Sequence, residues 1–194
     1  MFTFAGIFSS NMPILTNKFV SHQVSPQTEI LILGTFTHNH DHSGDFFFGR
    51  PRNFLWHLLP LCFKQDPLKD SSLSDKKAFM QKYKIDFMDV IETLDVEDGE
   101  EELLEEDFID LTAKTFFNLI NLVDTLPNLK AVYFTRKTFN GMPNIKLEVT
   151  KLAKHCNSKN IRICKLDTPA RHFSDEKQQQ WIDTIVLQKT CLRP

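Results

Sequence analysis

The sequence predicts an α/β protein, a three-layer α/β/α sandwich with a four-stranded parallel sheet. Short apolar runs rich in β-branched and aromatic residues alternate along the chain with segments of helical period. Strands separated by helices pair in parallel through right-handed crossovers, which place helices on both faces of a sheet. The 194 residues are 41% hydrophobic and 25% charged, which is ordinary for one globular domain.

Four runs of sequence are the predicted strands. The clearest is 29–35 (EILILGT), which ends at a glycine and has the mostly apolar character of a strand buried on both faces. The others are 130–135 (KAVYFT), 160–166 (NIRICKL) and the weaker run 85–91 (IDFMDVI).

Five segments have helical period: 53–63, 76–83, 113–126, 145–156 and 175–187. Sites in open parallel sheets lie outside the carboxyl ends of the strands. We therefore expect the site in the loops after Thr35, Ile91 and Leu166.

Acidic residues are concentrated in one segment. From Asp95 to Asp110 the chain has ten carboxylates and no Lys or Arg, so this run carries −10 and the rest of the chain carries +8 of the net −2. A basic body suits a phosphate-backbone partner, with the acidic run facing away from it. A solvated helix face or loop is the alternative interpretation of the run.

Several classes of protein are disfavoured. No stretch approaches the roughly 18 uninterrupted apolar residues of a membrane span, and the start, MFTFAGIF, lacks a basic region ahead of its apolar residues. We expect a cytoplasmic protein that has no membrane partner and acts as a monomer. The cysteines contain no C-x-x-C pair, which disfavours a zinc ribbon or a closely spaced iron–sulfur motif. We expect reduced thiols at Cys62, Cys156, Cys164 and Cys191.

The loop that follows the first strand supports two interpretations. In the first, His38, His40 and His42 are metal ligands, because with Asp41 they are similar to the T-H-x-H-x-D-H metal loop of the metallo-β-lactamase fold. The loop is one residue short of that motif, and no downstream G-H-T-x-G segment follows. Solvated histidines in a polar loop are the alternative, and we assign no metal.

The second interpretation starts from the aromatic and basic half of the loop. Phe46, Phe47 and Phe48 lead through G-R-P-R into Asn53 and a predicted helix. Aromatic rings beside an arginine-flanked helix start offer a stacking platform and amides that face an anion. Taken singly, each phenylalanine is better explained by core packing, and Asn53 by helix capping.

The span 29–56 resembles the motif-one region of the uracil-DNA glycosylase superfamily. It is closest to the mismatch-specific and hypoxanthine-DNA glycosylase branches, which carry a Gly-x-x-Pro strand end and an aromatic-[AG]-His-Pro-x-Asn-Arg-Phe-Trp helix start at the same spacing. Residues 84–91 resemble the family's G-I-x-x-x-D-V segment, and residues 131–138 its third strand. Residues 166–172 (LDTPARH) resemble its second motif, Leu-Pro-Ser-Thr-Ser-Pro-Ala-Asn.

The resemblance implies a uracil-DNA glycosylase-like domain over 29–194, with an N-terminal extension at 1–28 and an acidic insertion at 95–110. It implies base-excision repair of DNA that contains a damaged or mismatched base. The enzyme flips the deaminated or mispaired nucleotide, of the uracil or hypoxanthine class, out of the DNA and hydrolyses its N-glycosidic bond. No cofactor is needed for this reaction.

Residue roles also follow from the resemblance. Asn53 matches the asparagine of the helix start and is the first catalytic candidate, and Asp167 is the second. The substrate-binding candidates are Gly34, Thr35, Phe36, Phe48 and Thr168. The DNA-binding candidates are Arg50, Arg52, Arg171 and His172.

Some motif positions differ from the family pattern. Phe36 stands where many members have an Asp or Asn that positions water, Thr37 replaces a proline, and Arg50 replaces a histidine. Two alternatives to an active glycosylase follow. One is a catalytically silent nucleic-acid- or protein-binding module on the same fold. The other is a metallohydrolase that uses the histidine loop.

Overall fold

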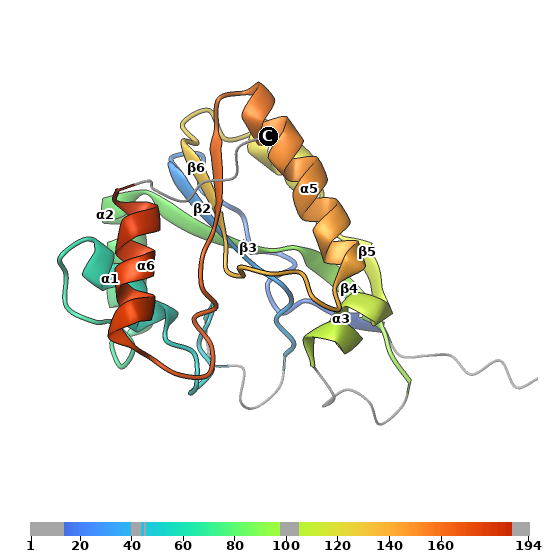
Figure 1. Ribbon diagram of the computed structural model, residues 1–194, viewed down its shortest axis with the longest axis horizontal. Coiled ribbons are helices and arrows are strands. Elements are labelled where there is room, and N and C mark those ends of the chain that lie inside the picture. The colour runs from blue at the N-terminus through green and yellow to red at the C-terminus, as the bar shows by residue number, and fades with distance from the viewer. Residues whose placement is uncertain (1–13, 40–43, 45, 98–104, 188–194) are drawn as a thin grey trace, which may run out of the picture.

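A computed structural model describes residues 14–39, 44, 46–97 and 105–187. It confirms the predicted architecture, because a four-stranded parallel sheet lies between helices on both sides (Figure 1). The strands, in the order in which they pair, are β3 (Ile85–Asp89), β2 (Ile30–Gly34), β6 (Ala131–Phe134) and β7 (Arg162–Lys165). Each strand lies inside one of the four runs expected from the sequence.

The side chains of β2 alternate between two cores, as the period of a strand requires. Leu31 and Leu33 join the core on the side of α5 (Pro143–Ser158) and α4 (Leu119–Asp124), whereas Ile32 joins the core on the other side. That other side is covered by α1 (Leu55–Cys62), α2 (Leu73–Tyr83) and α6 (Asp175–Ile185).

Local signals explain where the helices begin. Ser72 and Asp75 form a reciprocal capping box at the start of α2, and the Ser174 side chain accepts a hydrogen bond from the Lys177 amide at the start of α6. Pro143 opens α5, where its missing N–H costs no hydrogen bond.

A second, antiparallel sheet was not predicted. It consists of β1 (Ile14–Thr16), β4 (Ile91–Asp95) and β5 (Ala113–Phe116). The prediction of one helix over 113–126 is therefore wrong in its first part. Residues 113–116 pair with β4, and α4 starts only at Leu119, where the Asn118 side chain accepts a hydrogen bond from the Asn121 amide.

The acidic run ends in a helix that is anchored to the body of the protein. This helix, α3 (Glu106–Thr112), lies beside the start of α5 (Figure 1). The fully buried Asp110 carboxylate accepts hydrogen bonds from the amides of Asn144 at 3.0 Å and Ile145 at 2.7 Å. Residues 98–104 of the run lie outside the described residues.

Residues 14–28 contact the sheet closely. Besides the pairing of β1 with β4, Asn17 donates from Nδ2 to Asp89, and His22 and the Ser25 amide bond to Asp86. The domain boundary placed at residue 29 stays a prediction.

Two further sequence expectations concern thiols and membranes. Cys62 and Cys156 are free and buried, but Cys164 is disulfide-bonded, so the expectation of reduced thiols is wrong at that position. None of the described helices is long and apolar enough to cross a membrane.

Candidate functional site

A cavity of about 490 Å³, here called the site cavity, lies at the carboxyl ends of three parallel strands. Gly34 ends β2, Asp89 ends β3 and Thr135 follows β6, and all three line it. Its volume is typical of ligand pockets, which measure about 300–1,000 Å³. Nine residues singled out from the sequence line it: Gly34, Thr35, Phe36, Phe48, Arg50, Arg52, Asn53, Thr168 and Arg171.

Backbone strain is concentrated at this cavity. In the described part of the chain, five non-glycine residues have positive φ, and three of them, Lys64, Lys84 and Asn160, end or follow helices. Left-handed residues are common there because they close the last helical turn. The other two, Phe48 at 56° and Arg171 at 80°, both line the site cavity. Such strain persists where surrounding contacts hold a residue in place, and it clusters at functional sites.

Tertiary contacts join the two motifs that the sequence separates by more than a hundred residues. Asn53 and Ala170 form an isolated antiparallel bridge. The Phe54 amide donates to the Pro169 carbonyl at 2.8 Å, and the Arg171 amide donates to the Arg52 carbonyl at 2.9 Å. The helix start of the first motif and the loop of the second therefore form one wall of the cavity.

The loop of the second motif is also held in place by a lysine on α6. Lys177, which is buried on α6, donates from Nζ to the carbonyl oxygens of His172 at 2.6 Å and Ala170 at 3.3 Å. Burial lowers the pKa of Lys177, and the nearby Asp167 opposes that shift.

Asn53 uses one end of its side chain to begin α1. Its Oδ1 accepts a hydrogen bond from the Leu55 amide at 2.9 Å, an Asx-type turn that lies just before the helix, whose N-cap residue is Phe54. This bond fixes the orientation of the amide group, and no described residue accepts a hydrogen bond from Nδ2. Asn53 therefore brings an oriented N–H donor to the wall of the cavity.

Asp89 is a cavity residue that the sequence analysis did not select. Its side chain is 3% exposed and accepts hydrogen bonds from Asn17 Nδ2 at 2.9 Å and from Thr37. Burial raises the pKa of Asp89, although these donors and the charge of Arg50 oppose the shift. The signal in the sequence was the acidic residue at the carboxyl end of the strand predicted over 85–91.

Gly34 is required by the close approach of Asp89. A Cβ atom at residue 34 would lie 2.2 Å from Asp89 Oδ1 and 3.3 Å from Phe48 Cζ. Only glycine lets the end of β2, the buried carboxylate and the aromatic ring come together at this point.

The end of the acidic run lies at the cavity, and the orientation of the run relative to a phosphate partner stays a prediction. Glu105 and Glu106 both line the cavity, and Glu106 forms an ion pair with Arg136. The sequence analysis did not select Arg136 either. It follows β6 directly after Thr135, and it makes a fourth arginine in the lining beside Arg50, Arg52 and Arg171.

Two candidate residues do not line the site cavity. Asp167 forms an ion pair with Lys137 at 2.6 Å and borders a neighbouring hollow of about 730 Å³. His172 is exposed on the adjoining loop and lines neither space.

The alternative in which the histidine loop binds a metal is not tested by the described residues. His40, Asp41 and His42 lie outside the described residues. Across residues 14–39, 44, 46–97 and 105–187, no three His, Cys, Asp or Glu side chains are grouped as metal ligands would be.

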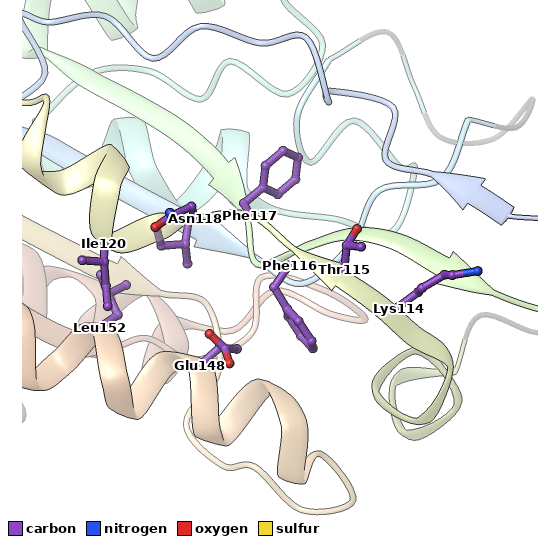
Figure 2. Close-up of a pocket in the computed structure, with 9 residues that line it drawn as sticks. Lys114, Thr115, Phe116, Phe117, Asn118, Ile120, Glu148 and Leu152 are labelled. Carbon is purple, nitrogen blue, oxygen red and sulfur yellow. The ribbon is translucent and has the colours of Figure 1, made fainter.

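A second cavity, here called the side cavity, has a volume of about 440 Å³ and lies between β5, α4 and α5. Figure 2 shows Phe116 and Phe117 projecting to opposite sides of the chain at the end of β5. Its charged side chains have partners outside it, since Lys114 pairs with Asp95 and Glu148 pairs with Lys151.

The fold and the site cavity define an α/β/α protein with its pocket at the carboxyl edge of a parallel sheet. One solved structure with this fold is a solution NMR structure from Methanosarcina acetivorans, named a "putative Uracil DNA glycosylase". The two superpose with a TM-score of 0.58 at 17% identity, over 88% of this chain and 92% of the other. The fold is therefore uracil-DNA glycosylase-like. No model of a known protein family matches the sequence, and no curated protein matches it.

Proposed function

We propose that this protein is a monofunctional DNA glycosylase that removes a deaminated or mispaired base, of the uracil or hypoxanthine class, from DNA. The observation that carries the proposal is the convergence of the two motif segments on one cavity at the carboxyl edge of the sheet. The solved structure with the same fold, named a "putative Uracil DNA glycosylase", supports the same class of reaction.

The flipped base is held by stacking and by polar contacts. Phe48 offers a ring at the cavity wall, packed edge-to-face against Phe87 with 5.6 Å between ring centroids. Because Gly34 has no side chain, the Asp89 carboxyl group can lie directly beside it. This carboxyl group forms hydrogen bonds with polar atoms on the edge of the base. Arg52 and Arg171 contact phosphates of the same strand.

Catalysis consists of breaking the bond between C1′ of deoxyribose and the base nitrogen while water adds to C1′. The products are the free base and an abasic sugar, and the water supplies the proton that the base takes up. Asn53 donates from Nδ2 to the departing base as negative charge develops on it, an interaction that strengthens in the transition state. The hydrogen bond from the Leu55 amide holds that donor in position.

A catalytically silent nucleic-acid-binding module is the second candidate. Two observations favour it: Asn53 Oδ1 is already bonded to the Leu55 amide, and Phe36, which is 6% exposed, cannot bond a water molecule. The same cavity and arginines would then capture an extruded nucleotide without cleaving it.

The test is a panel of oligonucleotides, each with one uracil, hypoxanthine or mismatched base, in single- and double-stranded form. Base release by the full chain, absent from Asn53→Ala purified in parallel, would establish the glycosylase. Binding to the panel without release of any base would establish the silent module. Release that stops on dialysis against a chelator and returns with added zinc would favour the metallohydrolase.

A further inference from the structure

The rim of the site cavity holds an arrangement of charge that base recognition does not explain. Arg136, Arg171 and Glu106 each line both the site cavity and the neighbouring hollow, so they stand on the boundary between the two spaces. Glu105 also lines both spaces, so two cations and two anions meet at this boundary.

The two arginines lie close enough to repel each other. The positive charge of Arg171 lowers the pKa of Arg136, in addition to the larger effect of burial. The Arg136 side chain is only 18% exposed, and Nε makes no hydrogen bond to any described atom. An anion beside Arg136 offsets both its lost hydration and the repulsion from the exposed Arg171.

Glu106 provides that anion in the free protein. Its carboxylate pairs with Arg136, and α3 is held in place because Asp110 bonds to the amides at the start of α5. The position of Glu106 therefore depends on the anchored helix and not on chance contact of a long side chain.

We propose that Arg136 and Arg171 form a binding site for a DNA phosphodiester, and that Glu106 occupies this site until DNA displaces it. The inference rests on the proposed function, because the phosphate is the one beside the nucleotide that enters the site cavity. A phosphodiester shares its single negative charge over two non-bridging oxygens, which can bridge the two guanidinium groups, whereas among the described residues Glu106 pairs only with Arg136. Competition by Glu106 weakens binding to undamaged DNA, which has no flipped base to add to the affinity.

The experiment measures binding of an undamaged duplex by fluorescence anisotropy over a range of salt concentrations. Glu106→Gln should bind about three- to tenfold tighter than wild type at low salt, because a surface ion pair no longer competes. Arg136→Gln should bind more weakly and lower the slope of log affinity against log salt by about one. In the Glu106→Gln/Arg136→Gln double variant, the gain from removing Glu106 should vanish, because its partner is gone.

The matched control is Glu148→Gln. It removes the same charge from a similar ion pair, between Glu148 and Lys151 on α5, outside both spaces at the carboxyl edge. An affinity gain equal to that of Glu106→Gln would mean that only net charge matters, and the proposal would be wrong. A gain from Glu106→Gln that persists in the Arg136→Gln background would also overturn it.

Two further comparisons keep the test decisive. If circular dichroism shows that Arg136→Gln is unfolded, the exposed Arg171→Gln replaces it, and the gain from Glu106→Gln should shrink in that background. Base release is measured separately. Wild-type release with identical binding by all variants refutes the phosphate site alone, whereas the expected binding pattern without any release refutes the enzyme alone. No binding by any variant refutes both.

Discussion

The site cavity and the side cavity have similar volumes, about 490 and 440 Å³, yet they differ in every property that bears on function. The site cavity lies where three parallel strands end, and it is lined by two strained residues and four arginines. The side cavity lies beside the edge strand β5, and its charged side chains form ion pairs with residues outside the cavity. Volume alone therefore does not identify a site; the convergence of strand ends and of polar groups does.

The largest expected difference concerns one asparagine in each cavity. Asn53 and Asn118 both line a cavity and both accept a backbone N–H near the start of a helix. Asn53→Ala should lower the single-turnover rate of base release about a hundredfold or more, because a preorganised donor is lost. Asn118→Ala should keep the full rate. Both should lose about 1 kcal/mol of stability, Asn118→Ala with the helix cap and Asn53→Ala with the turn that precedes α1.

Rates and melting temperatures of the two variants separate catalysis from capping. If Asn53→Ala melts lower but releases bases at the wild-type rate, the Asn53 side chain stabilises the start of α1 and takes no part in catalysis. Asp89, the buried carboxyl group in the same cavity, would then be the next catalytic candidate, ahead of Asp167, which pairs with Lys137 in the neighbouring hollow.

Aromatic side chains provide the second comparison. Phe48→Ala should weaken binding of a damaged duplex by about 1–3 kcal/mol, the value of one stacked base. Phe116→Ala, in the side cavity, should leave the affinity unchanged. Anisotropy with damaged and undamaged duplexes measures both. Equal losses on the two duplexes would show that Phe48 supports the structure and does not stack on a flipped base.

Substitutions of basic side chains should have a smaller effect on DNA affinity, which is measured from its dependence on salt concentration. Arg171→Ala should lower the slope of log affinity against log salt by about one, the share of a single phosphate contact. Lys114→Ala removes one cation from the side cavity, where Lys114 pairs with Asp95, and should leave the slope as it is. A slope that changes equally in both variants would place the DNA elsewhere on the protein.

The smallest effect concerns stability against pH. Burial holds the pKa of Asp89 above its ordinary value of 3.8, so the folded protein keeps a proton that the unfolded chain releases as pH rises above that value. The contribution of Asp89 to stability should therefore fall as pH rises through this window. The melting temperature of Asp89→Asn minus that of wild type should increase between pH 4 and pH 7.

Asp124 is the control with the opposite sign. It lies on α4 beside the side cavity, and hydrogen bonds from Lys159 and His155 lower its pKa below 3.8. Its contribution to stability is present above 3.8 and is lost as pH falls through the lowered value. The melting temperature of Asp124→Asn minus that of wild type should therefore decrease as pH rises. Parallel trends in the two variants would contradict the assignment for Asp89.

Prediction from sequence succeeded where the signal is local. The four parallel strands are continuous apolar runs because both of their faces are buried. Such runs can be identified in the sequence without knowing which segments pack against them. The antiparallel sheet was missed because its strands are short and mixed in polarity. Residues 113–116 have side chains that suit either a helix or a strand, and pairing with β4 decided between them.

The candidate site follows the same division. The sequence by itself predicted the parallel sheet and the edge at which its loops converge, because strand runs and their ends are properties of the chain alone. Its resemblance to the uracil-DNA glycosylase superfamily pointed to nine of the residues that line the cavity. Only the tertiary structure decided that Asp89 closes the cavity beside Gly34, that Asp167 lies outside it, and that Glu106 pairs with Arg136 at its rim. These outcomes depend on burial, repulsion and hydrogen bonds between residues distant in sequence, and such energies exist only once the chain has folded.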